Sequence, residues 1–201
     1  MKNLLKTVSV ILWCNFLTFF IWGIARAETY DDSKRKTLVT KYTIIQYQSF
    51  DDLKKFNMKL SYLPRIWGLE YLSSAHENNR LKNRITKKVD ALYERVQEIL
   101  GMQEKFNKGT IITICPNKEE LQAVYSRIDK RPRQAYGASS LPRAWYVQQL
   151  NTIYINIDDL HEGILAHEMA HSIIDNYLFI RPPGPTAEIL ARYVDSHLFV
   201  E

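Results

Sequence analysis

The motif His167-Glu168-Met169-Ala170-His171 constrains this chain more than any other feature, because it has the pattern H-E-x-x-H. Residues four apart lie on one side of an α-helix, so a helix through the motif turns both imidazoles toward a single metal ion. Zn²⁺ is the ion that suits two such histidines. The neighbours of the motif are apolar or small: Ile164, Leu165, Ala166, Met169, Ala170, Ile173 and Ile174. They predict a buried helix over roughly 160–177.

A third metal ligand is expected from the helix that follows. The segment Pro182-Pro183-Gly184-Pro185 breaks the chain, and a second helix is predicted over roughly 186–197. A helix, a proline-rich reversal and another helix place the two helices side by side in antiparallel directions. Glu188 is the acid early enough in the second helix to meet His167 and His171. Two histidines and one glutamate leave a fourth position open for water, as in catalytic zinc sites.

Glu168 is predicted as the catalytic base, because it faces the water next to the metal instead of the metal itself. Zinc lowers the pKa of a water molecule, so that Glu168 can take its proton during attack on a peptide carbonyl. The developing oxyanion also needs a hydrogen-bond donor. Tyr193 is the first candidate for this catalytic role, with Tyr146 and His197 after it. Ordinary packing is the alternative for each aromatic side chain.

Several further residues have two possible roles. Asp195 lies seven residues after Glu188, and Asp175 four residues after His171. Each could orient a ligand imidazole through its second ring nitrogen, or be a surface or capping acid. His161 is expected to help begin the helix, and His76 to lie on the surface. Trp145 is expected either to pack in a strand or to line a cleft.

The ligand pattern resembles a known family. His167-Glu168-x-x-His171 followed by Glu188 is similar to the gluzincin branch of the zincin metallopeptidases, the thermolysin-like (MA) superfamily, over about residues 144–197. The Trp and the Gly that members often carry around the third ligand are absent, since the stretch here is Thr186-Ala187-Glu188-Ile189. The resemblance implies an α+β zincin-like domain with a mixed sheet, an active-site helix and a C-terminal helix. It also implies that 152–157 is an edge strand that pairs with an extended peptide substrate.

The rest of the chain is expected to complete one domain over 28–201, since no linker is long enough to separate two. Runs rich in β-branched and aromatic residues predict strands over 42–48 and 110–115, and a hairpin of 144–148 with 152–157. Helical periodicity or capping residues predict helices from about 49, over 74–100, and from about 116. Residues 28–41 are expected to be a polar lead without regular structure, and 129–142 a loop.

The N-terminus has the pattern of a secretory signal peptide over 1–27. Lys2 and Lys6 precede an apolar run over 8–24, and Ala25-Arg26-Ala27 is a cleavage signature. The expected location is therefore outside the cytoplasm, either periplasmic or secreted. An uncleaved membrane anchor is the alternative, because the apolar run is close to the length of a short membrane span.

Cleavage would change the charge balance and the expected partners. Loss of Lys2, Lys6 and Arg26 takes the 27 Lys and Arg to 24, against 22 Asp and Glu, in a mature chain of 174 residues. A nucleic-acid partner is therefore not expected, and a peptide or protein substrate is. Basic clusters such as the one over 80–88 are expected to be solvated faces, with contact to an anionic envelope surface as the alternative. The remaining cysteine, Cys115, is expected to be buried and unreactive.

Two other functions are compatible with the motif. The first is a catalytically inactive zinc-binding module that acts in envelope protein binding or regulation. Glu168 argues against it, because a structural zinc site needs no base beside an open position. The second is a metal-free helical protein in which H-E-x-x-H is accidental. Glu188 at a workable spacing argues against that possibility.

Overall fold

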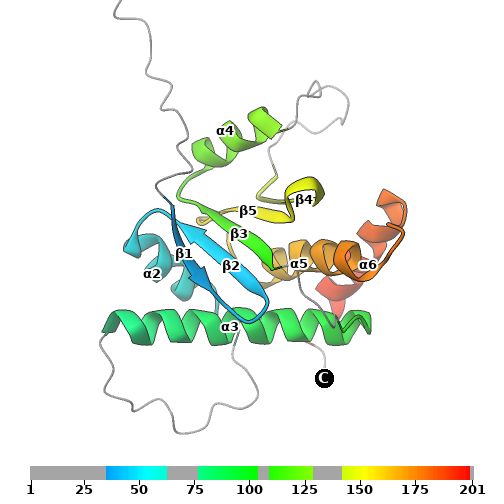
Figure 1. Cartoon of the computed structure of the whole chain (residues 1–201), viewed down its shortest axis with the longest axis horizontal. Helices are drawn as coiled ribbons and strands as arrows, with labels where there is room; N and C mark the ends of the chain where they lie inside the picture. The colour runs from blue at the N-terminus through cyan, green and yellow to red at the C-terminus, as the bar shows by residue number, and fades with distance from the viewer. Residues whose placement is uncertain (1–34, 63–76, 104–108, 129–141, 200–201) are drawn as a thin grey trace, which may run out of the picture. The chain divides into compact units, whose positions relative to one another are not determined.

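A five-stranded mixed sheet organises the computed structural model of this chain, which describes residues 35–62, 77–103, 109–128 and 142–199. All of them belong to one unit, Asp32–Glu201. The strands are β1 (Lys36–Val39), β2 (Thr43–Tyr47), β3 (Thr110–Cys115), β4 (Ala144–Val147) and β5 (Thr152–Asn156). The helices in the described residues are α2 (Phe50–Lys59), α3 (Glu77–Leu100), α4 (Lys118–Ile128), α5 (Glu162–Tyr177) and α6 (Gly184–His197) (Figure 1). The fold class α+β is confirmed at this level.

The strand order β1-β2-β3-β5-β4 corrects one prediction. β2, β3 and β5 are parallel, whereas β1 and β4 are antiparallel to their neighbours. β5 therefore lies inside the sheet, and the edge strand expected over 152–157 is wrong. The edge strands are β4, next to β5, and β1 at the opposite side of the sheet. The physical reason is that Ile153 and Ile155, both 0% exposed, suit an interior strand with neighbours on both sides.

β1 lies within the segment that was expected to be a polar lead, so that prediction is also wrong in part. Lys36 to Val39 pair antiparallel with Tyr47 to Ile44. Most of the strand is exposed, and Val39 is 68% exposed. An edge strand with so little burial has no apolar alternation for sequence analysis to detect, because its stability comes from backbone pairing with β2.

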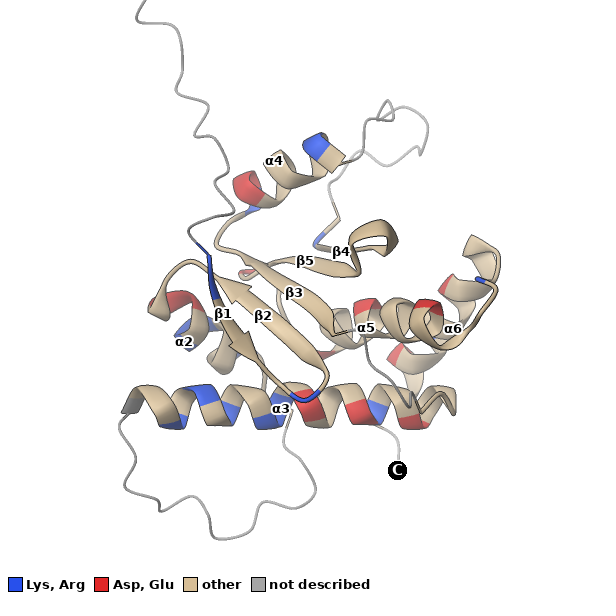
Figure 2. Ribbon diagram, in the orientation of Figure 1, with Lys and Arg blue, Asp and Glu red and all other residues tan. Residues whose placement is uncertain are grey.

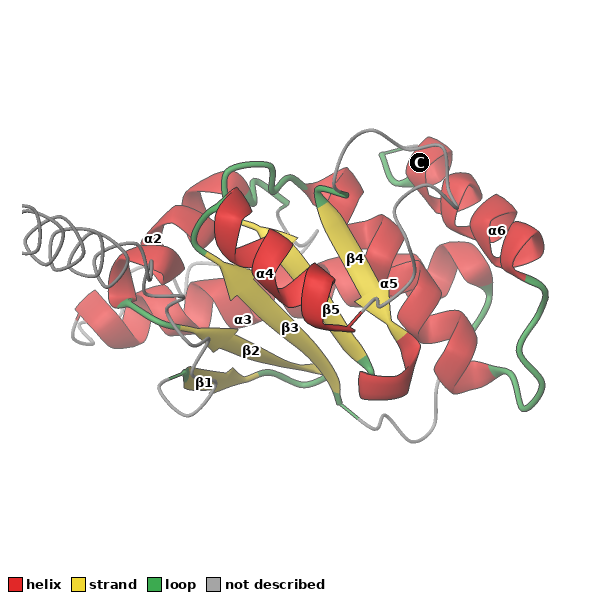
Figure 3. Cartoon of the chain, turned by 90° about the horizontal axis from the view of Figure 1, so that it is seen from above, coloured by secondary structure: helices red, strands yellow, loops and turns green. Residues whose placement is uncertain are grey.

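The helices form layers on both faces of the sheet. α4 covers one face, and α2, α3 and α5 lie on the other, where α6 packs against α5 and α3 (Figure 3). The core fills the space between the sheet, α3 and α5. Its fully buried side chains include Ile45, Phe56, Ile85, Leu92, Tyr93, Ile112, Ile153, Leu165 and Met169. This core holds α5, which carries the H-E-x-x-H motif, against the sheet.

Local signals set the helix ends as predicted. Ser49 and Asp52 form a reciprocal capping box at the start of α2. Asn117 accepts the backbone N–H of Glu120 at the start of α4. Gly101 follows α3 with φ +64°, a conformation that favours glycine at a helix end. The predicted strands and helices in the described ranges are thus confirmed, with small shifts of their ends.

Charge is unevenly distributed along α3. Lys and Arg gather in its first half and acids in its second (Figure 2). Arg80 and Lys87 are exposed, as expected of a solvated face. Lys88 is a correction, because it is 7% exposed and its Nζ donates to the carbonyls of Asn57 and Leu60. It caps the C-terminal end of α2, where helix carbonyls lack partners.

Some predictions concern residues outside the described ranges. The signal peptide over 1–27, His76 and nearly all of the loop over 129–142 are among them. Within the described residues, no helix has the length and apolarity needed to cross a membrane. Cys115 is described and buried, and burial is the main cause that raises the pKa of its thiol to about 12. Its predicted burial is confirmed.

Candidate metal centre

α5 presents the two histidines of the motif toward α6. His161 is its N-cap, and His161 Nδ1 accepts the backbone N–H of Ile164 at 3.4 Å, as predicted. The apolar side of α5 is fully buried, with Leu165, Ala166, Met169, Ala170 and Ile173 at 0% exposure. His167 and His171 occupy the remaining side, where 21% and 17% of their side chains are exposed. Solvent therefore reaches both rings.

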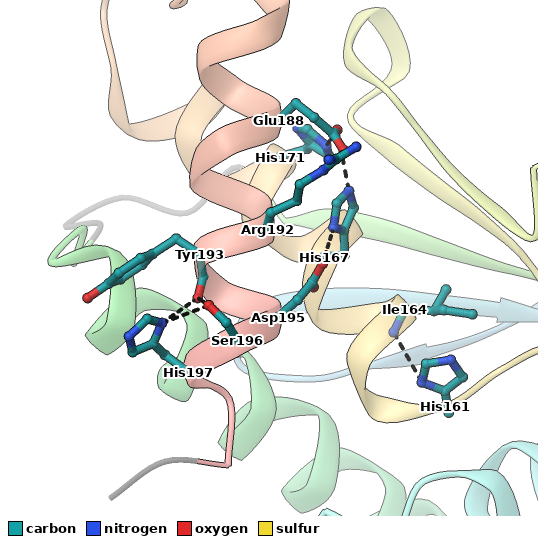
Figure 4. A network of polar contacts seen from close by, with 10 residues as sticks. All are labelled: His161, Ile164, His167, His171, Glu188, Arg192, Tyr193, Asp195, Ser196 and His197. Carbon is teal, nitrogen blue, oxygen red and sulfur yellow. Dashed lines mark hydrogen bonds and ion pairs between the residues drawn. The ribbon is translucent and has the colours of Figure 1, made fainter.

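α6 brings Glu188 to these histidines because small residues line its contact with α5. Ala187 and Ala191 are 1% and 0% exposed, and a helix surface of alanines allows close approach of two helices. The backbone N–H groups of Thr186 and Ala187 donate to the carbonyl of Pro183, which closes the first turn of α6. Glu188 follows directly, so its side chain points back toward α5 (Figure 4).

Three potential ligand atoms converge at this point. Glu188 Oε2 lies 3.6 Å from His167 Nε2 and 3.5 Å from His171 Nε2. Ligand atoms of the three residues all lie within 4.8 Å of one another. In a tetrahedral site with bonds of about 2.0–2.1 Å, neighbouring ligand atoms are about 3.3 Å apart. The spacing and the donor types both fit a zinc ion, so the predicted metal ligands come together as expected.

Two neighbouring side chains orient these ligands. Asp195 Oδ2 lies 2.9 Å from His167 Nδ1, which leaves Nε2 of that ring for a metal. The predicted contact between Asp195 and a ligand imidazole is therefore present. Arg192 Nε donates to Glu188 Oε1 at 2.8 Å, so Oε2 alone faces the histidines. Asp175, the other predicted partner of an imidazole, forms an ion pair with Arg181 instead.

The local charges favour binding of a cation. Burial, together with the nearby His167, lowers the pKa of His171, so its ring is kept in the neutral form that a metal requires. Burial acts to raise the pKa of Glu188, but the hydrogen bond from Arg192 and the charges of both histidines outweigh it, and the pKa is lowered. Glu188 therefore stays ionised.

Glu168, beside His167 on α5, reaches the edge strand β4. Its Oε2 accepts the backbone N–H of Tyr146, in β4, at 2.8 Å. Burial raises the pKa of Glu168 to about 7, although the charge of His167 and the Tyr146 hydrogen bond oppose this shift. A carboxyl group with a pKa near neutrality can both accept and return a proton at neutral pH.

Comparisons with known proteins return no match: no protein-family model, curated protein or solved structure is similar to the chain at a significant level. The family resemblance suggested by His167, His171 and Glu188 is thus neither supported nor contradicted by them. What the site does is inferred from its own residues.

The structure does not bring Tyr193 to the metal ligands. Tyr193 is 48% exposed, and its ring stacks on His197 with centroids 3.9 Å apart. Its side chain points away from His167 and Glu188 (Figure 4). The reason is helical geometry, because a residue five positions after Glu188 lies about 140° round the helix from it. The placement of Tyr193 does not support the predicted catalytic role. The same holds for His197, the later candidate, whose ring lies against that of Tyr193.

The other aromatic candidates have packing roles. The hydroxyl of Tyr146 donates to Asn151 Oδ1 at 3.2 Å, although its backbone N–H reaches Glu168. Trp145 packs against Tyr125 and Tyr154, with ring centroids 4.7 and 6.3 Å away.

Sequence analysis missed two contributors to the site. Arg192 could have been found, since it lies four residues after Glu188 on the same helix face. The Tyr146 N–H could not, because a backbone donor in a strand has no sequence signature.

Proposed function

We propose that this chain is a zinc-dependent metallopeptidase with a zincin-like fold of the gluzincin type. It hydrolyses peptide bonds outside the cytoplasm, in the periplasm or as a secreted protein. The observation that carries the proposal is the convergence of His167, His171 and Glu188, with Glu168 next to them. When bound, a zinc ion supplies Lewis-acid polarisation of a carbonyl and acidifies a water molecule. The N-terminal pattern of a signal peptide supports the location.

Each residue of the site has a defined task in this proposal. His167 and His171 would hold a zinc ion through Nε2, and Glu188 would hold it through Oε2. Asp195 keeps the ring of His167 in the required orientation. Glu168 accepts a proton from the attacking water on its carboxylate and then returns that proton to the leaving amine. A pKa of about 7 suits both steps.

The edge strand β4 supplies the place for a peptide substrate. Tyr146 pairs with Ile153 of β5 on one side, and its N–H points to Glu168 on the other. In the described part of the chain, β4 has no further strand opposite β5, and this side of β4 faces Glu168. An extended peptide can add to such an edge in antiparallel fashion, with backbone hydrogen bonds that hold the scissile carbonyl near Glu168.

The test combines metal analysis with a peptide assay. The purified protein is expected to bind one zinc ion and to cleave peptides from a fluorogenic library. Glu168→Gln is expected to keep the zinc and lower kcat at least about 100-fold, because the base is lost. Glu119→Gln, the same change at an exposed position of α4, is the matched control and should keep full activity.

The other outcomes separate the alternatives. A protein that binds zinc without hydrolysing any peptide would be the inactive zinc-binding module in envelope protein binding or regulation. A protein that binds no zinc would overturn the proposal entirely.

A further inference from the structure

Arg181, in the connection between α5 and α6, has a partner on each of two elements. Its Nε lies 2.9 Å from Asp175 Oδ1, and the Asp175 side chain is 4% exposed. Its Nη1 donates to the side-chain oxygen of Gln148. A guanidinium held on two sides loses little conformational entropy when it binds an additional group.

This guanidinium lies beside the proposed catalytic site. Asp175 is four residues after His171 on α5, which is about 6 Å along the helix. Gln148 directly follows Val147, the last residue of β4. Arg181 therefore spans the gap between α5 and the C-terminal end of the edge strand, one helical turn from His171.

Arg181 retains binding capacity. In the described part of the chain, Asp175 and Gln148 are its partners, through Nε and Nη1, and Nη2 is left over. The side chain is 42% exposed, so an incoming group can reach it. The carboxylate among the potential metal ligands, Glu188, is already paired with another arginine, Arg192.

The direction of β4 decides which part of a substrate meets Arg181. β4 runs from Ala144 to Val147, so a peptide paired antiparallel with it has its N-terminal half at the Val147 end. We infer that Arg181 binds an acidic side chain of the substrate on the N-terminal side of the scissile bond, an inference that rests on the proposed function. The substrates of this site are thus acidic peptides or acidic segments of proteins.

The competing explanation is that Arg181 only fastens the α5–α6 connection to the buried Asp175. Both roles predict a less stable protein when Arg181 is replaced. Only the substrate-binding role predicts a change in selectivity between an acidic and a neutral substrate. Selectivity is a ratio of two kcat/KM values for one enzyme sample, so the fraction of folded enzyme cancels.

The experiment uses pairs of fluorogenic peptides that differ by Glu or Gln two or three residues before the scissile bond. The wild-type protein is expected to prefer the Glu peptide by about fivefold to tenfold, as for a charge-assisted hydrogen bond. Arg181→Gln is expected to lower this ratio to about one. Arg181→Lys keeps the charge without the planar fork and should retain part of the preference. Arg143→Gln, just before the opposite end of β4, is the matched control and should keep the wild-type ratio.

The outcomes distinguish this inference from the proposed function. A wild-type ratio of one, or an unchanged ratio in both Arg181 variants, would overturn the role of Arg181 while hydrolysis continued. If the zinc-loaded protein cleaved neither peptide nor any member of the library, the proposed function would fail and this inference with it.

Discussion

Glu168 shows how a single side chain can be costly for folding and useful for chemistry. Its carboxyl group is buried, and among the residues that the structure describes its hydrogen-bond donor is the backbone N–H of Tyr146 in β4. Burial disfavours the charged form and raises the pKa to about 7. The folded protein therefore holds this proton more tightly than the unfolded chain does.

This difference predicts a pH-dependent stability in the zinc-free protein. Below about pH 4.5, Glu168 is protonated in both states and has no effect. Between pH 4.5 and 7 the unfolded chain releases the proton first, so the free energy of unfolding falls, by up to about 3 kcal/mol in total. Glu168→Gln cannot ionise. Its free energy of unfolding relative to wild type should therefore rise across that window and stay constant above it.

Urea unfolding in EDTA between pH 4 and 8.5 measures this effect. Glu119→Gln, which removes an exposed acid, is expected to show a difference from wild type that hardly varies over the same range. A Glu168→Gln difference that is equally flat would show that the pKa of Glu168 is not raised.

Arg192 and Asp195 determine which atoms of Glu188 and His167 are available to a metal ion. Arg192 occupies one oxygen of Glu188, and Asp195 occupies the inner nitrogen of His167. Glu188 is thereby left with Oε2, and His167 with Nε2, as the atom available to a metal ion. A set of single-atom ligands with a solvent-accessible side is suited to a four-coordinate ion with an open position.

At the scale of elements, the turn between β4 and β5 is tied to α5 by a partly buried polar network. Asn151 Oδ1 accepts hydrogen bonds from Tyr146, Ser172 and Asn176 at 3.2, 3.3 and 3.2 Å. Ser172 Oγ also lies 2.6 Å from Thr110 Oγ1 in β3. The network thus connects β3, α5 and the turn that follows the edge strand β4. It thereby helps to keep Tyr146 of β4 within hydrogen-bond distance of Glu168 of α5.

Asn151 also has a left-handed backbone, with φ 46°. Asn151→Ala is expected to lower the free energy of unfolding by about 3 kcal/mol, because it removes the shared acceptor and strains the backbone. Asn151→Gly removes the acceptor without the strain, so it should cost about 1 kcal/mol less. Chemical denaturation of both variants measures the difference. Equal losses would mean that the backbone conformation of Asn151 contributes nothing.

For the whole molecule, a metal ion would connect two helices that otherwise meet through small side chains. The unfolded chain does not hold His167, His171 and Glu188 together, so zinc should bind the folded state and stabilise it. Zinc at about 100 times its Kd is expected to add about 2.7 kcal/mol to the free energy of unfolding. EDTA should reverse the gain.

Thermal unfolding with zinc and with EDTA tests this coupling. Glu188→Gln is expected to lose most of the zinc-dependent rise in Tm, whereas Glu119→Gln should keep it. If zinc raised the Tm of Glu188→Gln as much as that of wild type, zinc would not be held by this carboxylate.

The sequence by itself determined the parts of the site that depend on distance along one helix or across one short turn. His167 and His171 share a face because they are four residues apart, and Asp195 follows Glu188 by two turns. The same helical geometry places Tyr193 away from Glu188, so the spacing of the two residues already argued against the catalytic role. These relations depend on 3.6 residues per turn, which any α-helix with these residues must obey.

Only the tertiary structure decided which strand is the edge, and therefore what faces Glu168. β5 pairs with β3 across about 40 residues of chain. β1 pairs with β2 although its own side chains are hardly buried, so no apolar pattern in the sequence indicates the pairing. Lys88 is buried for a similar reason, because the end of α2 supplies its carbonyl partners. Such hydrogen bonds join segments distant in sequence, and their free energy depends on packing that no local pattern records.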